Sequence, residues 1–157
     1  MTYEGTQPLQ KRGSYYHLEI TAEVVNQWEK KRATRLICTI DDHVTLRCGL
    51  NHLGNGDFYI MLAKRYVQKI GKEAGEIISY KLEEDPNPLG VEIPEVLEVF
   101  LAQDPDGQAI FNKLTDGRKR TLIFSILRIK NVDKQVESIL KFLQAEHEKQ
   151  RAKKSSW

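Results

Sequence analysis

The sequence predicts an α+β protein in which a small closed β-barrel of about six strands is followed by a bundle of about four helices. Two observations carry this prediction. Apolar residues alternate along several short segments between residues 15 and 93, as in strands with one buried face, and they recur at helical spacing after Pro94. Residues 56–84, GDFYIMLAKRYVQKIGKEAGEIISYKLEE, read in order as strand, short helix, turn and strand.

The predicted barrel domain covers residues 15–93, and short turns separate its strands. Its strands are expected at Tyr15–Ile20, Arg35–Ile40, His43–Leu50, Phe58–Leu62, Ile77–Glu83 and Leu89–Ile93. Thr21 suits the N-cap of a helix that runs to about Lys31. Gly71 supplies a left-handed stop for the short helix that precedes it. Six strands would close a barrel without help from a second chain.

The helical module is expected over residues 94–147. Pro94 suits a first helical position, and Asp104 and Thr115 suit N-caps. The clearest amphipathic stripe consists of Val132, Val136, Ile139, Leu140 and Leu143. The run at 121–129, TLIFSILRI, fits a helix or a strand; as a helix it would bury Leu122, Ile123, Ile126, Leu127 and Ile129.

The two ends and the charge distribution complete the outline. Residues 1–14 are expected to be a partly disordered leader, and residues 148–157 a charged, frayed tail. The chain shows neither a signal peptide nor a long apolar run, so a cytoplasmic protein without membrane insertion is expected. The net charge is only +2, although residues 83–106 hold eight acids and residues 117–157 hold eleven Lys or Arg against four acids.

Specific segments carry a resemblance to a known family. In residues 15–85 they are ICTIDDHVTLRCGL, GNGDFYIML and AKRYVQKIGKEAGEIISYKLEEDP; in residues 91–146 they are VEIPEVLEVFLAQDPDGQAIFNKL and TDGRKRTLIFSILRIKNVDKQVESILKFL. On these motifs the chain resembles a two-part bacterial family of unknown function. Its members pair a small barrel, itself similar to AbrB-like barrels, with a helical module called bacteriocin-protection YdeI/OmpD-associated.

The resemblance implies the architecture and no established chemistry. A connection with stress or bacteriocin protection would follow from the family label alone. The chain also departs from the family pattern at two places: Gly75-Glu76 replaces Gly-Asp, and Ser125-Ile126 replaces Trp-Ile before a segment with fewer arginines. Any role that those arginines have in the family therefore does not carry over.

A metal site is not expected. Cys38, His43, Cys48 and His52 give the spacing C-x4-H-x4-C-x3-H, which is not a recognised zinc pattern. On a hairpin that turns at Asp41-Asp42, the cysteines face the core and His43 faces outward, so one ion would need both faces of the sheet.

The same hairpin predicts two reduced, buried thiols. With a two-residue turn, Cys38 lies opposite Thr45 and Cys48 lies opposite Arg35. The thiols are then about 10 Å apart along the ladder, which is beyond the reach of a disulfide.

The sequence offers no catalytic residue or cofactor motif, because it lacks a nucleophile elbow, a Gly-rich phosphate loop and a zinc-protease pair. We therefore expect a non-enzymatic binding module for a small ligand or a protein. Loops on a rigid scaffold often carry function, so the site is placed at the NHLGNGD segment. Its candidate residues are Arg47, Asn51, His52 and Asn55.

Two alternatives remain open. An AbrB-like nucleic-acid-binding protein would use basic residues for anion contacts, and the candidates are Lys64, Arg65, Arg118, Lys119 and Arg120. An enzyme with an unrecognised site is the other alternative. Specific DNA binding is not expected, and neither is a stable dimer, because this chain supplies enough strands of its own and carries an acidic stretch between its basic regions.

Overall fold

The computed structural model describes residues 1–155, which form two compact units. Unit 1 comprises residues 1–90 and contains all of the β-structure, and unit 2 begins at Val91 and is helical.

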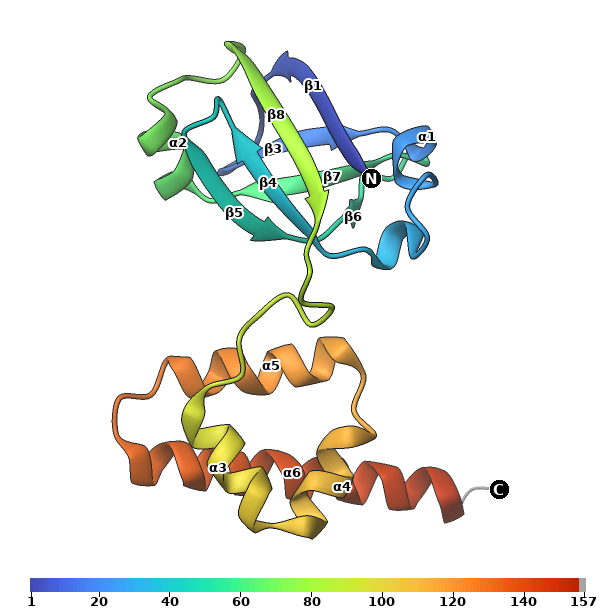
Figure 1. Ribbon diagram of the computed structural model, residues 1–157, viewed down its shortest axis with the longest axis vertical. Helices are drawn as coiled ribbons and strands as arrows, with labels where there is room; N and C mark the ends of the chain where they lie inside the picture. Colours follow the sequence, from blue (N-terminus) through green and yellow to red (C-terminus); the bar gives the residue numbers. More distant parts are fainter. Residues whose placement is uncertain (156–157) are drawn as a thin grey trace. The chain divides into compact units, whose positions relative to one another are not determined.

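Unit 1 contains two four-stranded antiparallel sheets (Figure 1). Sheet A has the order β1 (Thr2–Pro8), β8 (Ile77–Glu84), β4 (Leu36–Ile40) and β5 (Val44–Cys48). Sheet B has the order β2 (Gln10–Arg12), β3 (Tyr15–Ile20), β7 (Phe58–Leu62) and β6 (Asn51–His52). The α+β class is confirmed. The closed barrel of about six strands is wrong, because the strands hydrogen-bond as two sheets that are not closed into a barrel.

The chain crosses between the two sheets four times, and two of these crossings are short bends. Leu9 alone separates β1 from β2, and Gly49 and Leu50 separate β5 from β6. Strands that bend in this way are typical of two sheets whose strands cross at a large angle, and the crossing is visible in Figure 1.

The predicted disordered leader is instead part of both sheets. β1 pairs with β8 from Thr2↔Glu83 to Pro8↔Ile77. Leu9 is buried, and its backbone exchanges hydrogen bonds of 2.8 Å with Glu76 and Gly75. The segment is ordered because β8 needs a partner along this edge and β1 supplies it.

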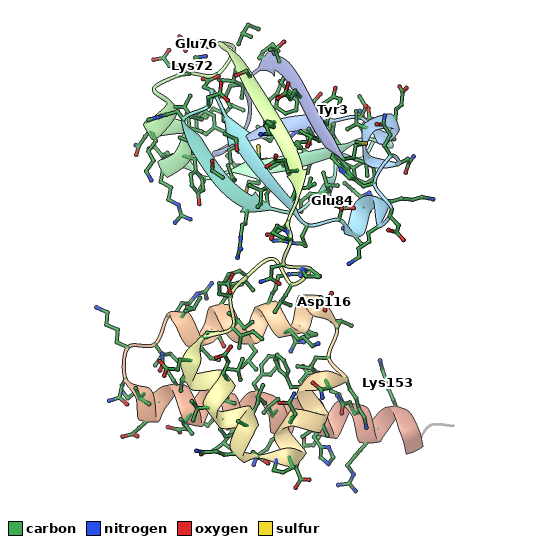
Figure 2. The ribbon with its side chains drawn as sticks, in the orientation of Figure 1. Tyr3, Lys72, Glu76, Glu84, Asp116 and Lys153 are labelled. Carbon is green, nitrogen blue, oxygen red and sulfur yellow. The ribbon has the colours of Figure 1, made fainter. Side chains whose placement is uncertain are left out.

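The core of unit 1 lies between the sheets and is built from alternate residues of the strands. Its fully buried members include Leu18, Ile20, Leu36, Cys38, Ile40, Ile60, Leu62, Ile78 and Leu82. Tyr80 is buried above Gly5, its partner on β1, where an added Cβ would lie 2.7 Å from the tyrosine oxygen. Tyr3, labelled in Figure 2, packs beside the same ring with the centroids 6.1 Å apart.

Two helices flank these sheets. α1 (Ala22–Val25) is capped by Thr21, whose hydroxyl accepts from the Val24 amide, but the helix ends well before Lys31. The chain then leads through buried Trp28 to a 3-10 turn at Lys31–Ala33. α2 (Lys64–Ile70) ends at Gly71 with φ 74°, as the left-handed stop predicts.

The β4–β5 hairpin has a register different from the predicted one. Ile40 pairs with Val44, so three residues form the turn, and Asp41 and Asp42 both have positive φ (52° and 51°). The extra residue shifts every pair by one, and Cys38 and Cys48 lie opposite Leu46 and Leu36 instead of Thr45 and Arg35.

No strand forms at Leu89–Ile93, so that prediction is wrong. Asn87 instead closes a turn: its side-chain oxygen accepts from the Leu89 amide and its carbonyl accepts from the Gly90 amide. Gly90 has φ 76°, and a Cβ there would lie 2.6 Å from Nε of Arg35. The turn therefore requires a glycine.

Unit 2 contains α3 (Glu95–Gln103), α4 (Pro105–Asn112), α5 (Asp116–Leu127) and α6 (Val132–Ser155). Asp104 and Thr115 cap α4 and α5 as predicted, each accepting a 3.2 Å hydrogen bond from the amide three residues later. Pro94 is the N-cap of α3 and not its first helical residue.

The ambiguous run at 121–129 is helical as far as Leu127. Leu122, Ile123 and Ile126 are buried, but Leu127 is 59% exposed and Leu140 on α6 is 42% exposed, against the prediction. Both lie on the flank of a helix, one step outside the buried stripe. The predicted frayed tail is helical to Ser155, and residues 156 and 157 lie outside the described part of the chain.

Within residues 1–155, no helix has both the length and the apolar character needed to cross a membrane.

Candidate functional site

The four ligand residues predicted around the NHLGNGD segment do not converge on one point. Asn51 and His52 form β6, where they pair with Tyr59 and Phe58. Directly opposed residues share a face of the sheet, so Asn51 lies on the outward face with Tyr59, while His52 lies on the face of buried Phe58. Asn55 uses its side-chain oxygen to accept from the Asp57 amide at 3.0 Å.

Arg47 is held in sheet A by a buried acid. Its Nε lies 3.3 Å from Oδ2 of Asp85, whose side chain is fully buried. The Asp85 amide donates to the Arg35 carbonyl at 2.9 Å. The ion pair and the backbone hydrogen bond hold the chain at the end of β8, so the charge of Arg47 stabilises the fold.

The basic candidates of unit 2 are engaged within that unit. Nε of Arg118 donates to Oε1 of buried Glu146 at 2.9 Å, and the guanidinium lies over the Phe142 ring. The ammonium of Lys119 lies 5.3 Å from the Phe111 ring centroid. Arg120 is half-buried and likewise has a partner. Arg118 and Lys119 therefore contact other residues of the bundle and do not form an open basic patch.

Lys64 and Arg65 are exposed at the start of α2. The Arg65 guanidinium lies 4.8 Å from the centroid of the neighbouring Tyr66 ring and donates to its hydroxyl at 3.1 Å. Lys64 projects from the surface directly after β7. This basic pair therefore lies beside sheet B.

The cysteines are buried and free. Burial raises the pKa of Cys38 to about 12, and burial followed by the nearby Cys38 thiol raises the pKa of Cys48. Thiols with such pKa values are not nucleophiles at neutral pH. Among residues 1–155, no three His, Cys, Asp or Glu side chains gather closely enough to hold a metal ion.

An open hollow of about 390 Å³ lies on sheet A. Hydroxyl and charged residues line it, among them Glu4, Thr6, Thr39 and Lys81. Its polar side chains are exposed or half-exposed to water, so nothing in the hollow requires a ligand.

A more informative cluster lies on the outward face of sheet B and was not found from the sequence. In β3, Tyr16, Leu18 and Ile20 face the core, which leaves Tyr15 and His17 on the outer side. His17 is nevertheless only 4% exposed. A histidine on the outer face of a small domain is expected to be hydrated, so its burial needs an explanation.

Two tyrosines bury this histidine. The Tyr15 and Tyr59 rings are nearly parallel, with an interplanar angle of 26° and centroids 6.1 Å apart. The imidazole lies 6.0 Å from the first ring and 5.6 Å from the second. We call Tyr15, His17 and Tyr59 the tyrosine–histidine cluster.

Neither ring nitrogen of His17 has a hydrogen-bond partner among the described residues. The nearest acid, Glu19, places Oε1 3.6 Å from Nε2, too far for a hydrogen bond. A neutral imidazole offers one donor and one acceptor, and leaving them buried and unpaired costs roughly 1–3 kcal/mol each. The two nitrogens are thus unsatisfied polar groups beneath the outward face of sheet B.

One signal in the sequence could have indicated this cluster. Tyr15, His17 and Glu19 alternate with the core residues of β3, and Tyr59 and Met61 alternate with those of β7. Three aromatic rings on the solvent side of two strands are unusual for a face that only meets water. The pairing of β3 with β7, which brings the rings together, is not visible in the sequence.

The comparisons with known proteins concern the two units separately. Residues 7–82 match the family model described as Domain of unknown function (DUF1905). Residues 90–148 match the model described as Bacteriocin-protection, YdeI or OmpD-Associated. A search of curated proteins gave no match. The two matches, in this order, correspond to the pairing of a domain of unknown function with a YdeI/OmpD-associated module, the arrangement that the motifs of the chain resemble.

Proposed function

We propose that the protein is a non-enzymatic binding module and that its binding surface is the outward face of sheet B, centred on the tyrosine–histidine cluster. The observation that carries this proposal is the buried, unpaired imidazole of His17. Each such group in a native structure requires a reason, and a ligand that pairs with it supplies one.

The surroundings of His17 support a planar ligand with hydrogen-bonding groups. Tyr15 and Tyr59 provide stacking faces, and half-exposed Met61, which pairs with His17 across the ladder, extends the apolar surface. Asn51 lies opposite Tyr59 and adds an amide on the same face. Aromatic and apolar contacts with a few placed polar groups are typical of ligand sites.

The proposal replaces the NHLGNGD loop as the main site and retains one of its residues, Asn51. It also favours binding over catalysis, because the cluster contains no nucleophile paired with a base and an orienting group. A role in protection against bacteriocins, which the description of the second family names, is compatible with such a module, since protection by capture needs no chemistry.

The test is a chemical-shift titration of the isotope-labelled full chain with a panel of planar probes: uridine, adenosine, tryptophan amide and a tyrosine dipeptide. The ring signals of Tyr15, His17 and Tyr59 are expected to move together with one binding curve. In His17→Phe, which keeps a ring but removes both nitrogens, the response should fall several-fold, while His43→Phe at the exposed hairpin turn should leave it unchanged. Shifts confined to residues 53–57 or to the hollow on sheet A would contradict the proposal.

A further inference from the structure

We propose that the ligand of this face is a single-stranded nucleic acid, bound without strong sequence preference. This inference rests on the proposed function, because it names the chemical class that fits the same surface. Three observations support it: the paired tyrosine rings, the unsatisfied imidazole, and the distribution of charge around the ends of sheet B.

The first observation is the pair of tyrosine rings. Tyr15 and Tyr59 are half-buried, nearly parallel and carried by different strands, so they form a fixed aromatic surface. Unpaired bases stack on such rings, and every base has a suitable face, which makes the contact tolerant of sequence. Exposed Met61 continues the surface along β7.

The second observation is the imidazole that lies beside both rings. Its two nitrogens lack partners among the described residues. The edge of a base that is not paired with another base presents both donors and acceptors. A nucleobase therefore supplies the stacking plane and the missing hydrogen bonds in one group, whereas a plain aromatic ring supplies only the first.

The third observation is the charge. Residues 10–18 and 58–72, which include β2, β3 as far as Leu18, β7 and α2, contain no acid. Exposed Lys11 and Arg12 lie on β2, where Arg12 pairs with Tyr15. Leu62 pairs with Tyr16, and Lys64 and Arg65 follow two and three residues later.

The side chains Arg12, Lys64 and Arg65 form what we call the basic end of sheet B, next to Tyr15. Lys11 does not belong to it, because it pairs with Tyr16 on the other face of the sheet, and its ammonium lies 5.3 Å from the centroid of the Tyr16 ring. The acid of this face, Glu19, lies toward the other end of β3. A phosphate backbone is therefore favoured at the Tyr15 end and repelled beyond His17, which limits the contact to a few nucleotides.

A single strand fits this surface better than a duplex does. In a duplex the base faces are already stacked and cannot rest on the tyrosines. A proline-rich peptide would also use tyrosine rings, but it would have no use for three cations at one end. The charge distribution decides between these two partners.

The experiment measures binding of the full chain to fluorescently labelled eight-nucleotide oligouridylate and oligothymidylate by anisotropy, from 25 to 200 mM NaCl. A 12-base-pair duplex and a proline-rich peptide serve as competing probes. Both single strands are expected to bind with micromolar affinity and the other probes much more weakly. The slope of log K against log salt should be about −2, since three cations each contribute about 0.7 on a single strand.

The variants separate stacking from charge. Tyr59→Ala should weaken binding by about ten-fold at every salt concentration, and Tyr59→Phe should retain most of the affinity because it keeps the ring. The double substitution Arg12→Gln and Lys64→Gln should make the salt slope shallower by about 1.4. The matched control, Lys30→Gln with Arg32→Gln on the segment after α1, should leave the slope unchanged.

Each remaining outcome has a defined meaning. Binding of the peptide without binding of either oligonucleotide would overturn this inference and leave the proposed function standing. Oligonucleotide binding that Tyr59→Ala does not weaken, in a variant whose amide spectrum shows a folded unit 1, would also overturn it. Failure of all probes to shift the tyrosine–histidine cluster would overturn both proposals.

Discussion

At the scale of single residues, His17 combines a stability cost with a proposed binding role. Its imidazole is removed from water by Tyr15 and Tyr59 but receives no hydrogen bond from the described residues in return. Protein sites that serve ligands often retain such groups at the expense of stability.

Replacing His17 with Phe is therefore expected to stabilise unit 1 by roughly 1 kcal/mol while it weakens ligand binding, because the ring contacts remain and the unpaired nitrogens disappear. Urea unfolding followed by the fluorescence of buried Trp28, in a Trp157→Phe background, measures this difference. His43→Phe is the control. A loss of stability in His17→Phe that exceeds the control would indicate that the imidazole is already satisfied in the free protein.

Asp41 illustrates the opposite case, a polar residue whose partners are all in place. Its Oδ1 accepts from the amide and hydroxyl of Ser79, and Oδ2 lies 2.9 Å from Nζ of Lys72. Lys72, labelled in Figure 2 in the connection between α2 and β8, also donates to the Ile77 carbonyl. One carboxylate thus ties the β4–β5 turn to the start of β8.

This arrangement makes unit 1 sensitive to acid. Burial alone would raise the pKa of Asp41, but the hydrogen bonds from Lys72 and Ser79 outweigh it and lower the pKa below the ordinary value. The stabilisation is therefore complete above the unfolded-state pKa of about 4 and is lost as the pH falls through the lower folded-state pKa. Asp41→Asn should cost roughly 1 kcal/mol at pH 7, and the difference from the parent should shrink below pH of about 4.

Unfolding of both proteins between pH 7 and pH 2.5 tests this prediction. Asn tolerates positive φ, so the turn is retained in the variant. Asp42→Asn, with φ 51° and an exposed side chain, is the matched control and should show little change. A pH-independent difference between Asp41→Asn and the parent would contradict the assignment.

At the scale of elements, the helix starts in unit 2 depend on single side chains. Asp104 and Thr115 accept the hydrogen bonds that open α4 and α5. Substituting either by Ala should cost roughly 1 kcal/mol of stability, whereas Ala at exposed Asp106, in the first turn of α4, should cost less. Urea unfolding followed by circular dichroism at the helix band gives the values, and equal losses at Asp104 and Asp106 would show that the cap is not important.

The sequence was sufficient to predict the features that depend on local signals of this kind. The caps at Thr21, Asp104 and Thr115 and the stop at Gly71 are recognisable because each needs only neighbouring residues. β7 was predicted with its observed bounds because Phe58, Ile60 and Leu62 alternate with outward residues. The spacing of apolar residues and the capping of helices are properties of short segments, so they can be recognised without knowledge of the fold.

Features that depend on distant partners were missed. The inner side of β1 carries Tyr3, Gly5 and Gln7, which do not form an apolar pattern in the sequence. The contact of this side with the core is made by Tyr80, which fills the space above Gly5. The register of the β4–β5 hairpin depends on two successive residues in the left-handed region, Asp41 and Asp42. The Asp-Asp pair in the sequence does not by itself indicate that conformation. The tyrosine–histidine cluster exists only because β3 pairs with β7.

At the scale of the whole molecule, we expect a monomer. The edge strands of sheet B, β2 and β6, are only three and two residues long, and such short edges offer a second chain little to pair with. Light scattering at micromolar concentration should give 18.1 kDa. The exposed apolar residues Phe124, Leu127 and Leu140 of unit 2 are the obvious route to association, so a measured dimer that Leu127→Glu restores to a monomer would show this expectation to be wrong.

The pairing of β1 with β8 also sets an order of events during synthesis. Residues 2–8 leave the ribosome before the rest of unit 1, yet their partners are residues 77–83, near the end of the unit. Until β8 emerges, β1 has nothing to pair with, and β4 lacks its neighbour on one side. Pairings between distant parts of a chain form slowly, because the intervening chain must first be ordered. During most of the synthesis of unit 1, β1 and β4 therefore lack their partner strand β8. A pause of the ribosome just before residue 77 would prolong the time in which β4 is exposed to other nascent chains.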